Sequence, residues 1–295
     1  MDAVTLPPSS SRIVFIDIDG TILEHGSRMA ASTPAAIAAA RANGHIVYLC
    51  TGRSAGDINP RVRAIEVDGA ITNGGAFAVR GDEQIVAHPM PRPLVDRMIE
   101  YFVSHDAYYF LQTDDSVYVS PGVLEYAAKF RHAAHPPVDG STASAEADER
   151  AGAADDAALL NHYRPLDEVD RDAVVKATFL STSSDTLTLA AGELGPEFHV
   201  IPGSIPLPGG SNGEICQRGV NKGAAILEVL AFLGLDPADA VGIGDSWNDV
   251  EMFEVVGTAV AMGGADPALQ AKADLVTTDV LDDGIHNALT RLGLI

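Results

Sequence analysis

The sequence predicts an α/β fold in which a doubly wound parallel sheet is interrupted by an inserted α+β domain. Apolar, strand-like runs alternate with helix-like segments over short links in residues 13–72, which is typical of a parallel sheet. Hairpin patterns mix with helices in residues 77–206, which favours a separate α+β domain. The first pattern returns from Asn212. We therefore predict a core domain in two parts, residues 1–76 and 207–295, on either side of the inserted domain.

The composition is that of a globular protein with a strong excess of negative charge. The chain of 295 residues is long enough for two domains, and 46% of its residues are apolar. The formal net charge is -22 and the pI is near 4.5, so we expect neither nucleic-acid nor anionic-membrane partners. Lysine is rare, so the position of each lysine is informative: Lys129, Lys176, Lys222 and Lys272.

The cysteines and the first residues predict a cytoplasmic protein. Cys50 and Cys216 do not make a disulfide framework, and Cys50 lies in a predicted buried strand. Residues 1–11 contain no apolar region of the kind found in signal peptides, and no apolar stretch is long enough to span a bilayer. We therefore expect a soluble protein without membrane contact.

The first predicted strand, residues 13–16, is followed by two closely spaced carboxylates. Its apolar residues are typical of a strand buried on both faces of a parallel sheet. If the chain stays extended after it, Asp17 and Asp19 point to the same side. Two such carboxylates repel each other and need a cation or a shared proton. An Asp-Gly turn would explain Asp19 and Gly20 but not Asp17, so we interpret the pair as a metal or catalytic site.

The rest of the first core part continues in strand–helix order. Thr33 as N-cap and Pro34 as first helical residue predict a helix that ends near Gly44. Buried strands are predicted over residues 45–50 and 69–72. Each strand runs into a turn that contains glycine, Thr51-Gly52-Arg53 after the first and Asn73-Gly74-Gly75 after the second.

The inserted domain is predicted to combine short strands with helices. The predicted strands cover residues 76–80, 84–88, 108–113, 116–120, 174–181 and 197–201. The predicted helices cover residues 94–104, 124–133 and 185–194. Residues 138–156 are rich in small and acidic residues and predict a mobile loop or a marginal helix.

Strands and helices alternate again in the second core part. Asn221 predicts the N-cap of a helix that ends near Leu233. The remaining elements are a strand over residues 240–244, a helix over 247–255, a strand over 258–262, a helix after Asp266-Pro267, a strand over 275–277 and a helix over 283–292.

Polar residues follow three of these strands, at Asp17, Thr51 and Asp245. In open α/β sheets, ligands bind outside the carboxyl ends of the strands. The glycines and helix starts beside these residues present N–H groups that bind anions. By itself Thr51-Gly52 is an ordinary structural turn, so its interpretation depends on the other two strand ends.

The segment Gly244-Asp-Ser-Trp-Asn-Asp249 places two carboxylates and an amide at a strand-to-helix turn. Ser246 and Asp249 fit a capping box, so a purely structural role for Asp249 is one alternative. Capping does not explain Asp245, because it precedes the cap at the end of the strand.

Lys222 stands one residue after the predicted N-cap, where the helix dipole disfavours a cation. We infer that a negative group holds it, either a phosphate or a carboxylate such as Asp249; a solvated surface lysine is the alternative. Carboxylates, a hydroxyl and a lysine together fit phosphoryl transfer with Mg²⁺, which prefers carboxylate, water and phosphate oxygens. The metal and the lysine would neutralise phosphate charge and allow an anionic nucleophile to approach.

Four motifs resemble those of the haloacid dehalogenase-like phosphatases, in the Cof-type branch with a type IIB cap. They are Asp17-Ile-Asp-Gly-Thr21, Thr51-Gly52-Arg53, Lys222 within Gly219-Val-Asn-Lys-Gly223, and Gly244-Asp-Ser-Trp-Asn-Asp249. The segment Ala259-Val-Ala-Met-Gly-Gly-Ala265 is also similar, although Gly264 stands where the branch commonly has Asn. The resemblance implies a Rossmann-like core domain with residues 77–206 as an inserted cap domain.

The resemblance also implies roles for the site residues. Asp17 would be the nucleophile that forms an aspartyl-phosphate, and Asp19 would be the general acid and then the base. The phosphoryl group would be bound by Thr51, Gly52 and Lys222. The ligands of Mg²⁺ would be Asp17, the carbonyl oxygen of Asp19, and Asp245. The supporting residues would be Arg53, Asn73, Asn248 and Asp249.

The activity implied by the resemblance is that of an Mg²⁺-dependent phosphatase acting on a small phosphorylated metabolite, such as a sugar phosphate. The cap would close over the site and exclude water. Two alternatives stay open: phosphoryl transfer to a second hydroxyl, as in a phosphomutase acting on sugar phosphates, and a non-catalytic sensor of phosphorylated ligands. Candidate cap residues for substrate contact are His88, Tyr108, Tyr109 and Tyr118.

Overall fold

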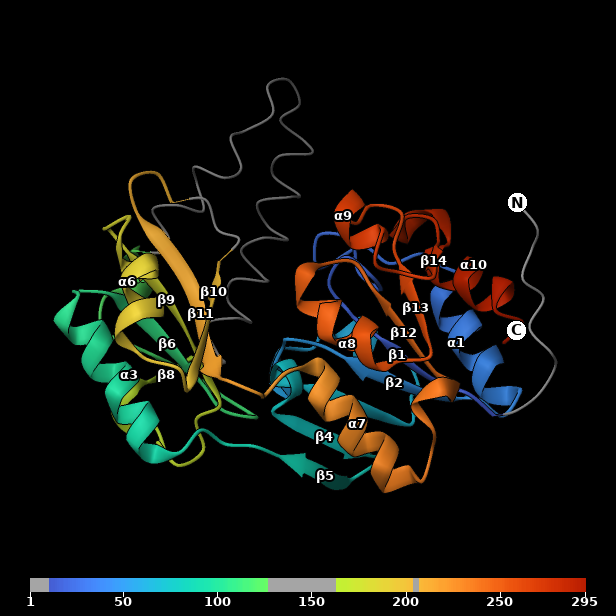
Figure 1. Ribbon diagram of the computed structural model, residues 1–295, viewed down its shortest axis with the longest axis horizontal. Helices are drawn as coiled ribbons and strands as arrows, with labels where there is room; N and C mark the ends of the chain where they lie inside the picture. The colour runs from blue at the N-terminus through green and yellow to red at the C-terminus, as the bar shows by residue number, and fades with distance from the viewer. Residues whose placement is uncertain (1–10, 127–162, 204–206) are drawn as a thin grey trace. The chain divides into compact units, whose positions relative to one another are not determined.

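The computed structural model describes residues 11–126, 163–203 and 207–295. The chain separates into two compact units (Figure 1). One consists of Met1–His88 and Gly219–Ile295, and the other of Pro89–Arg218. The predicted loop at residues 138–156 and most of the predicted helix at residues 124–133 lie outside the described residues.

The first unit is built on an eight-stranded, mostly parallel sheet. Its strands are β1 (Ile13–Ile16), β2 (Ile46–Cys50), β3 (Gly69–Thr72), β4 (Phe77–Arg80), β5 (Glu83–Ala87), β12 (Ala240–Gly244), β13 (Thr258–Ala261) and β14 (Leu275–Val276). They lie in the order β14-β13-β12-β1-β2-β3-β4-β5. Neighbours from β14 to β3 are parallel, and β4 and β5 pair antiparallel at one edge. The predicted doubly wound parallel sheet is confirmed.

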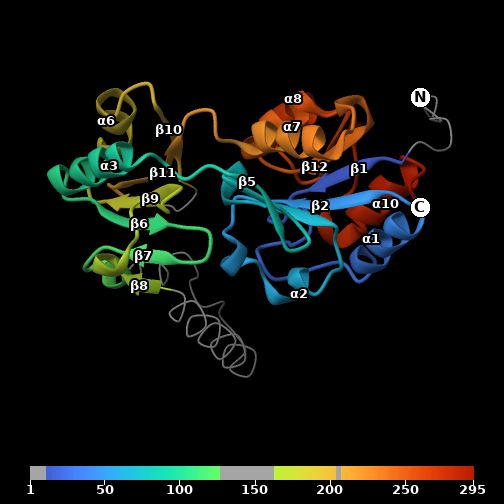
Figure 2. The same ribbon diagram turned by 90° about the horizontal axis from the view of Figure 1, so that it is seen from below.

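Helices cover both faces of this sheet, as Figure 2 shows. On one face lie α1 (Thr33–Ala42), α2 (Pro60–Arg63) and α10 (Gly284–Arg291); on the other lie α7 (Lys222–Leu233), α8 (Val250–Val255) and α9 (Pro267–Gln270). Alternate residues of β1 serve the two faces, because side chains alternate along a strand. Val14 packs in the cluster that contains Ile37 of α1, and Phe15 packs with Ile226 of α7. Burying one such side chain contributes about 1.5–3 kcal/mol.

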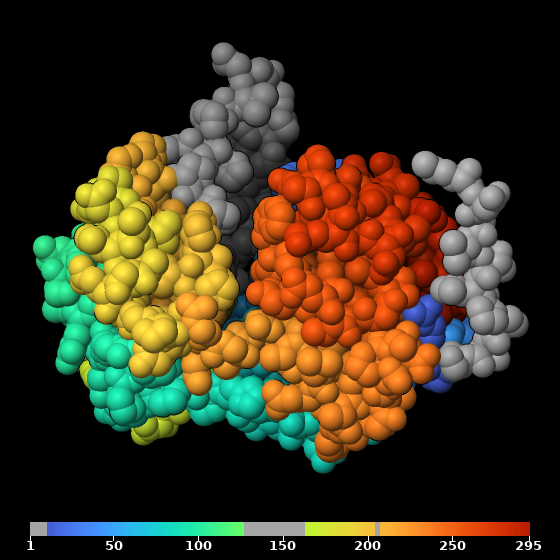
Figure 3. Space-filling model, in the orientation of Figure 1, coloured from blue at the N-terminus to red at the C-terminus, as the bar shows by residue number. Residues whose placement is uncertain are grey.

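The strand β1 lies in the interior of the first unit. Residues 219–295, coloured orange to red, form most of the visible surface of the first unit, and the blue N-terminal part of the chain is seen only at its edge (Figure 3). All four residues of β1 are fully buried. The carboxylates that follow β1 therefore start from the interior of the unit.

Two segments belong to a different sheet from the one that was predicted for them. The hairpin β4-β5 was expected in the inserted domain, but β4 pairs with β3 and extends the core sheet. β11 (Ser211–Gln217) was expected in the core, but it pairs with strands of the second unit. The chain therefore passes from one unit to the other after His88 and after Arg218, later than the expected boundaries after residues 76 and 206. A hairpin pattern reveals pairing between two neighbouring strands and not the sheet that they join.

The second unit is an α+β structure with helices on one face of a six-stranded sheet. Its strands are β6 (Tyr108–Gln112), β7 (Val117–Val119), β8 (Tyr163–Pro165), β9 (Lys176–Ser181), β10 (Phe198–Pro202) and β11, in the order β10-β11-β9-β6-β7-β8. Helices α3 (Arg92–Ser104) and α6 (Thr186–Glu193) contribute to the hydrophobic cluster on one face. The strand β8 was not predicted. In residues 11–126, 163–203 and 207–295, no helix has the length and apolar character needed to cross a membrane.

Each of the four aromatic or imidazole residues considered for substrate contact has a structural contact in the described part of the chain. Tyr109 and Tyr118 are buried in the core of the second unit. His88 belongs to the first unit, and its ring lies 2.8 Å from a carboxylate oxygen of Glu228. Tyr108 stacks on Tyr126 with ring centroids 4.6 Å apart.

Candidate active site

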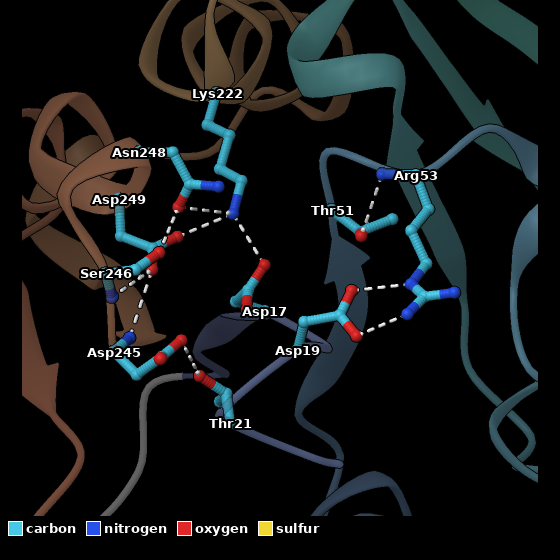
Figure 4. Close-up of polar contacts among 10 residues, drawn as sticks. All are labelled: Asp17, Asp19, Thr21, Thr51, Arg53, Lys222, Asp245, Ser246, Asn248 and Asp249. Carbon is cyan, nitrogen blue, oxygen red and sulfur yellow. Dashed lines mark hydrogen bonds and ion pairs between the residues drawn. The ribbon is translucent and has the colours of Figure 1, made fainter. Parts of the chain in front are cut away.

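The predicted site residues of the first unit converge where the order of the sheet reverses. β1 lies between β2, which follows it in the chain, and β12 from the C-terminal part. Such a switch point is where open α/β sheets bind ligands. The carboxyl ends of these three strands carry Asp17, Thr51 and Asp245. Figure 4 shows them together with Asp19, Arg53, Lys222, Asn248 and Asp249.

Lys222 is the centre of the polar contacts, although only 2% of the residue is exposed. Its ammonium group donates to Asp17 Oδ1 and to Asp249 Oδ1, at 2.6 Å each, and lies 3.5 Å from Asn248 Oδ1 (Figure 4). The side chain of Asn221 caps the helix by accepting from the N–H of Ala224 at 2.8 Å, as predicted. The inference that a negative group holds Lys222 is confirmed for the carboxylates of Asp17 and Asp249, and the alternative of a solvated surface lysine is wrong.

Asp249 has a structural role and a place in the site at the same time. Its Oδ2 accepts from the backbone N–H groups of Asp245 and Ser246, at 3.0 and 3.1 Å, as an acid in the first helical turn does. Its Oδ1 accepts from Lys222. The carboxylate fits there because Gly244 has no side chain: a Cβ on Gly244 would lie 2.5 Å from Asp249 Cγ. Capping therefore explains one oxygen of Asp249 and the lysine explains the other.

The turn after Asp19 packs against the carboxylate of Asp245. Thr21 Oγ1 donates to Asp245 Oδ1 at 3.2 Å. Gly20 has φ +84°, and a Cβ there would lie 2.0 Å from Asp245 Oδ2. Only glycine permits both the positive φ and this approach. The hydroxyl of Thr21 was part of the predicted motif without a role, and its contact depends on the folding of β12 beside β1.

Asp17, Asp245 and Asp249 form a cluster with more negative charge than its neighbours compensate. Each offers a carboxylate oxygen, and these atoms all lie within 4.8 Å of one another. Lys222 is the cation in contact with them, and it contacts Asp17 and Asp249. Three carboxylates around one ammonium group leave a site that fits a divalent cation, which takes carboxylate oxygens as ligands. The predicted metal ligands Asp17 and Asp245 are in this cluster, and Asp249, predicted only to support it, is a third.

The pKa values of the two aspartates Asp17 and Asp245 are raised mainly by burial. Burial raises the pKa of Asp17 to about 8, against a lowering by Lys222. Burial and the charge of Asp249 raise the pKa of Asp245 to about 6. For Lys222, burial lowers the pKa, but the carboxylates of Asp17 and Asp249 outweigh it and the net pKa is raised. A cation beside the carboxylates would favour their ionised forms.

Asp19 turns its carboxylate away from this cluster and toward Arg53 (Figure 4). Arg53 Nε and Nη2 each donate to one oxygen of Asp19, at 2.5 and 2.6 Å. Arg53 Nη1 also donates to the carbonyl oxygen of Asp57 at 3.2 Å. The hydrogen bond to Asp19 raises the pKa of Arg53. The side chain of Asp19 is thus not among the clustered carboxylates, which leaves its carbonyl oxygen as the group that the prediction assigned to a metal.

Thr51 and the Asn73 turn lie on the side of the site formed by β2 and β3. Thr51 is buried, and its Oγ1 accepts from the N–H of Arg53 at 3.1 Å. The N–H of Asn73 donates to the carbonyl oxygen of Arg53 at 2.7 Å. Arg53 and Asn73 therefore meet through the backbone, a contact that sequence reasoning did not predict.

Comparison with known proteins identifies relatives along nearly the whole chain. A family model described as haloacid dehalogenase-like hydrolase matches residues 14–289. The 5-amino-6-(5-phospho-D-ribitylamino)uracil phosphatase YwtE of Bacillus subtilis is 26% identical over 286 residues, which cover 95% of this chain and 98% of the relative. The pyridoxal phosphate phosphatase YbhA of Escherichia coli is 27% identical over 280 residues, which cover 94% and 96%.

A solved structure shows the same fold. The chain is similar to the structure described as the HAD subclass IIB sugar phosphatase BT4131, with a TM-score of 0.73 and 22% sequence identity. The alignment covers 97% of this chain and 100% of that one. The predicted fold class, a Rossmann-like core with an inserted α+β cap domain, is confirmed by this likeness.

Proposed function

The chain belongs to the haloacid dehalogenase-like hydrolase family, and we propose that it is an Mg²⁺-dependent phosphatase that hydrolyses a small phosphorylated metabolite, such as a sugar phosphate. The observation that carries the proposal is the position of Lys222 between Asp17 and Asp249 at the switch point of the sheet. A buried cation there supports the binding of an anionic group beside a carboxylate nucleophile. Charged side chains are normally exposed to water, so a buried cluster of a lysine and carboxylates departs from a local rule. Such departures are typical of functional sites.

In the proposed mechanism a carboxylate oxygen of Asp17 attacks phosphorus, and the bond from phosphorus to the leaving oxygen breaks. The carboxyl group of Asp19 gives its proton to that oxygen. Water then attacks the aspartyl-phosphate, Asp19 takes a proton from it, and phosphate leaves with Asp17 restored. Lys222 and Thr51, with the N–H of Gly52, would bind the phosphoryl oxygens. Bound Mg²⁺ would neutralise charge that develops on the phosphoryl group.

Two of the three clustered carboxylates, Asp17 and Asp245, would bind the metal by their side chains, and Asp19 would bind it by its carbonyl oxygen. Asp249 would act mainly by orienting Lys222 and the backbone of Asp245, since its oxygens already accept from these groups. Asn248 lies 3.5 Å from the ammonium group and accepts from Ser246 Oγ at 2.7 Å. Its role would be to help hold the ammonium group of Lys222 in place.

The names of the two relatives support the choice of a small phosphorylated substrate. One acts on a phosphorylated ribitylaminouracil and the other on pyridoxal phosphate, according to their names. In both, the phosphate is carried by a small organic molecule. We therefore expect this protein to prefer small phosphate esters over nucleic acid, in keeping with its net charge of -22.

A hydrolysis screen tests the proposal. Purified protein with Mg²⁺ is incubated with sugar phosphates, nucleotides and cofactor phosphates, and released inorganic phosphate is measured. We expect turnover of at least one ester by the natural chain and a loss of at least about 10⁴-fold in kcat for Asp17→Asn. Steady-state hydrolysis by folded Asp17→Asn at the natural rate would refute the assignment of Asp17 as the nucleophile.

The same assay separates the alternatives. Phosphoryl transfer would show as a phosphorylated acceptor sugar in place of free phosphate when acceptors are added. A sensor would bind phosphorylated ligands in a calorimeter without turnover of any ester in the panel.

A further inference from the structure

The turn η2 (Asn73–Gly75), which follows β3, has an uncommon backbone. Its φ angles are +51° at Asn73, +67° at Gly74 and +108° at Gly75. For Asn73 this conformation costs free energy, because the left-handed region is unfavourable for residues with a Cβ. Both polar atoms of the Asn73 side chain are also buried without a hydrogen-bond partner in the described part of the chain. Backbone strain and a buried side-chain amide without a partner, both at one turn, are features that often mark a functional role.

On one side, the turn holds the loop after β2. The N–H of Asn73 donates to the carbonyl oxygen of Arg53 at 2.7 Å, and the N–H of Gly74 donates to that of Thr51 at 3.0 Å. These two carbonyl groups flank Gly52. The loop that carries Thr51 and Arg53 is therefore fixed by hydrogen bonds from consecutive residues of the turn.

On the other side, the turn touches the peptide that leads into Lys222. A Cβ on Gly75 would lie 2.1 Å from the carbonyl oxygen of Asn221 and 3.1 Å from the backbone nitrogen of Lys222. Helix α8 meets the next residue of the same segment, since a Cβ on Gly223 would lie 2.3 Å from the carbonyl oxygen of Glu251. Lys222 thus begins its helix between two close backbone contacts, and each depends on a glycine.

We propose that the Asn73–Gly75 turn is a positioning element that sets the distance between Thr51 and Lys222, and through it the affinity for the phosphoryl group. The turn contacts the backbone on both sides, so a shift in it moves the two groups relative to each other. This inference rests on the proposed function, in which Thr51 and Lys222 bind the same phosphoryl group. Strain in the turn is then part of the arrangement that holds the site ready for its ligand.

The test compares three glycine-to-alanine variants that share a positive φ. Gly75→Ala adds a Cβ that must displace the carbonyl of Asn221. Gly74→Ala, with φ +67°, adds a Cβ that meets nothing within 4 Å in the same turn. Gly81→Ala, with φ +56°, does so in the β4-β5 hairpin and is the control for backbone strain alone. Folding is checked by circular dichroism, and the dissociation constant of inorganic phosphate is measured by calorimetry with Mg²⁺ present.

For Gly75→Ala we expect phosphate affinity and kcat/KM to fall by about 10- to 100-fold, because a displacement near 1 Å suffices for such losses. Gly81→Ala is expected to bind phosphate as the natural chain does, and Gly74→Ala to lose less than Gly75→Ala. Phosphate affinity of folded Gly75→Ala equal to that of Gly81→Ala would overturn the proposal. If the natural chain neither binds phosphate nor hydrolyses any ester, the proposed function itself fails, which is a different result.

Hydrogen exchange on the natural chain provides a measurement that needs no variant. If the turn links the two phosphate-binding groups, bound phosphate should slow the exchange of the N–H groups of Asn73 and Gly74. Exchange of the N–H of Gly81 should not change. Equal exchange of the Asn73 and Gly74 N–H groups with and without saturating phosphate would count against a positioning role, even if Gly75→Ala does not fold.

Discussion

Arg53 holds both carboxylate oxygens of Asp19, through Nε at 2.5 Å and Nη2 at 2.6 Å. The two residues are 34 positions apart and come from the loops after β2 and β1. A bidentate pair of this kind fixes direction as well as distance. In the proposed reaction one oxygen of Asp19 must give up its hydrogen bond to Arg53 in order to carry a proton. Arg53 therefore determines the position of the carboxyl group before the reaction.

Arg53→Lys should therefore lower kcat more than it lowers stability. Lysine offers a point charge and cannot reproduce the two parallel hydrogen bonds. We expect kcat to fall by about 10- to 100-fold, as for other misplaced catalytic groups. The free energy of unfolding should change by no more than about 1 kcal/mol, because both side chains are partly exposed. Steady-state kinetics and urea unfolding measure the two effects.

Arg28→Lys is the matched control for this change. Arg28 pairs with Glu24 at 2.8 Å, and its side chain is 64% exposed. The control is expected to keep the natural kcat. A kcat of Arg53→Lys equal to that of the control would show that the orientation of Asp19 by Arg53 is unimportant.

Removing the buried cation should destabilise the protein in a way that depends on metal. Lys222→Met leaves Asp17 and Asp249 buried without their ion-pair partner. In EDTA we expect a loss of about 3–5 kcal/mol in the free energy of unfolding. Mg²⁺ should restore part of it, because the cation compensates the same carboxylates. Urea unfolding with and without Mg²⁺ measures this, and Lys272→Met, at an exposed position, is the control.

Chelation should abolish phosphatase activity, and Mg²⁺ should restore it. Asp245→Asn removes one charge from the carboxylate cluster and should weaken Mg²⁺ binding by at least about tenfold in a calorimetric titration. Asp82→Asn, at an exposed position in the β4-β5 turn, should bind Mg²⁺ as the natural chain does. Full activity after exhaustive chelation would rule out the metal.

The stability of the metal-free protein should decrease between about pH 4 and pH 8 through Asp17 and Asp245. Their pKa values rise from 3.8 to about 8 and about 6 on folding, so the folded chain binds more protons than the unfolded chain in this window. The free energy of unfolding contributed by these groups therefore falls as pH rises. This contribution to stability is fully present below the ordinary pKa of 3.8 and is lost above the pKa that each group has in the folded chain.

Denaturant unfolding in EDTA across this range measures the effect. Asp17→Asn should flatten the decrease, because the asparagine does not ionise. Added Mg²⁺ should stabilise the natural chain more near pH 8 than near pH 5, since it binds the ionised carboxylates. An identical pH dependence for Asp17→Asn and the natural chain would contradict the raised pKa of Asp17.

Local signals in the sequence were enough to predict most elements of the core and one of its unusual charges. Strand β3 has the predicted bounds, Gly69–Thr72, and Asn221 caps helix α7 as expected. The position of Lys222 at a helix start predicted a negative partner, because the dipole and the charge conflict there. Hydrophobic periodicity, caps and turn residues act within a few residues, so a sequence displays them directly.

The sequence by itself determined the order of the elements, the polar ends of three strands and the family to which the chain belongs. Only the tertiary structure decided that β4 and β5 extend the core sheet, that Asp19 faces Arg53, and that Asp249 joins the carboxylate cluster. Those outcomes depend on pairing between segments that are distant in the chain: Lys222 and Asp17 are 205 residues apart. A pattern of neighbours cannot specify such partners, because hydrogen bonds and ion pairs select them only after the sheet has brought its strands together.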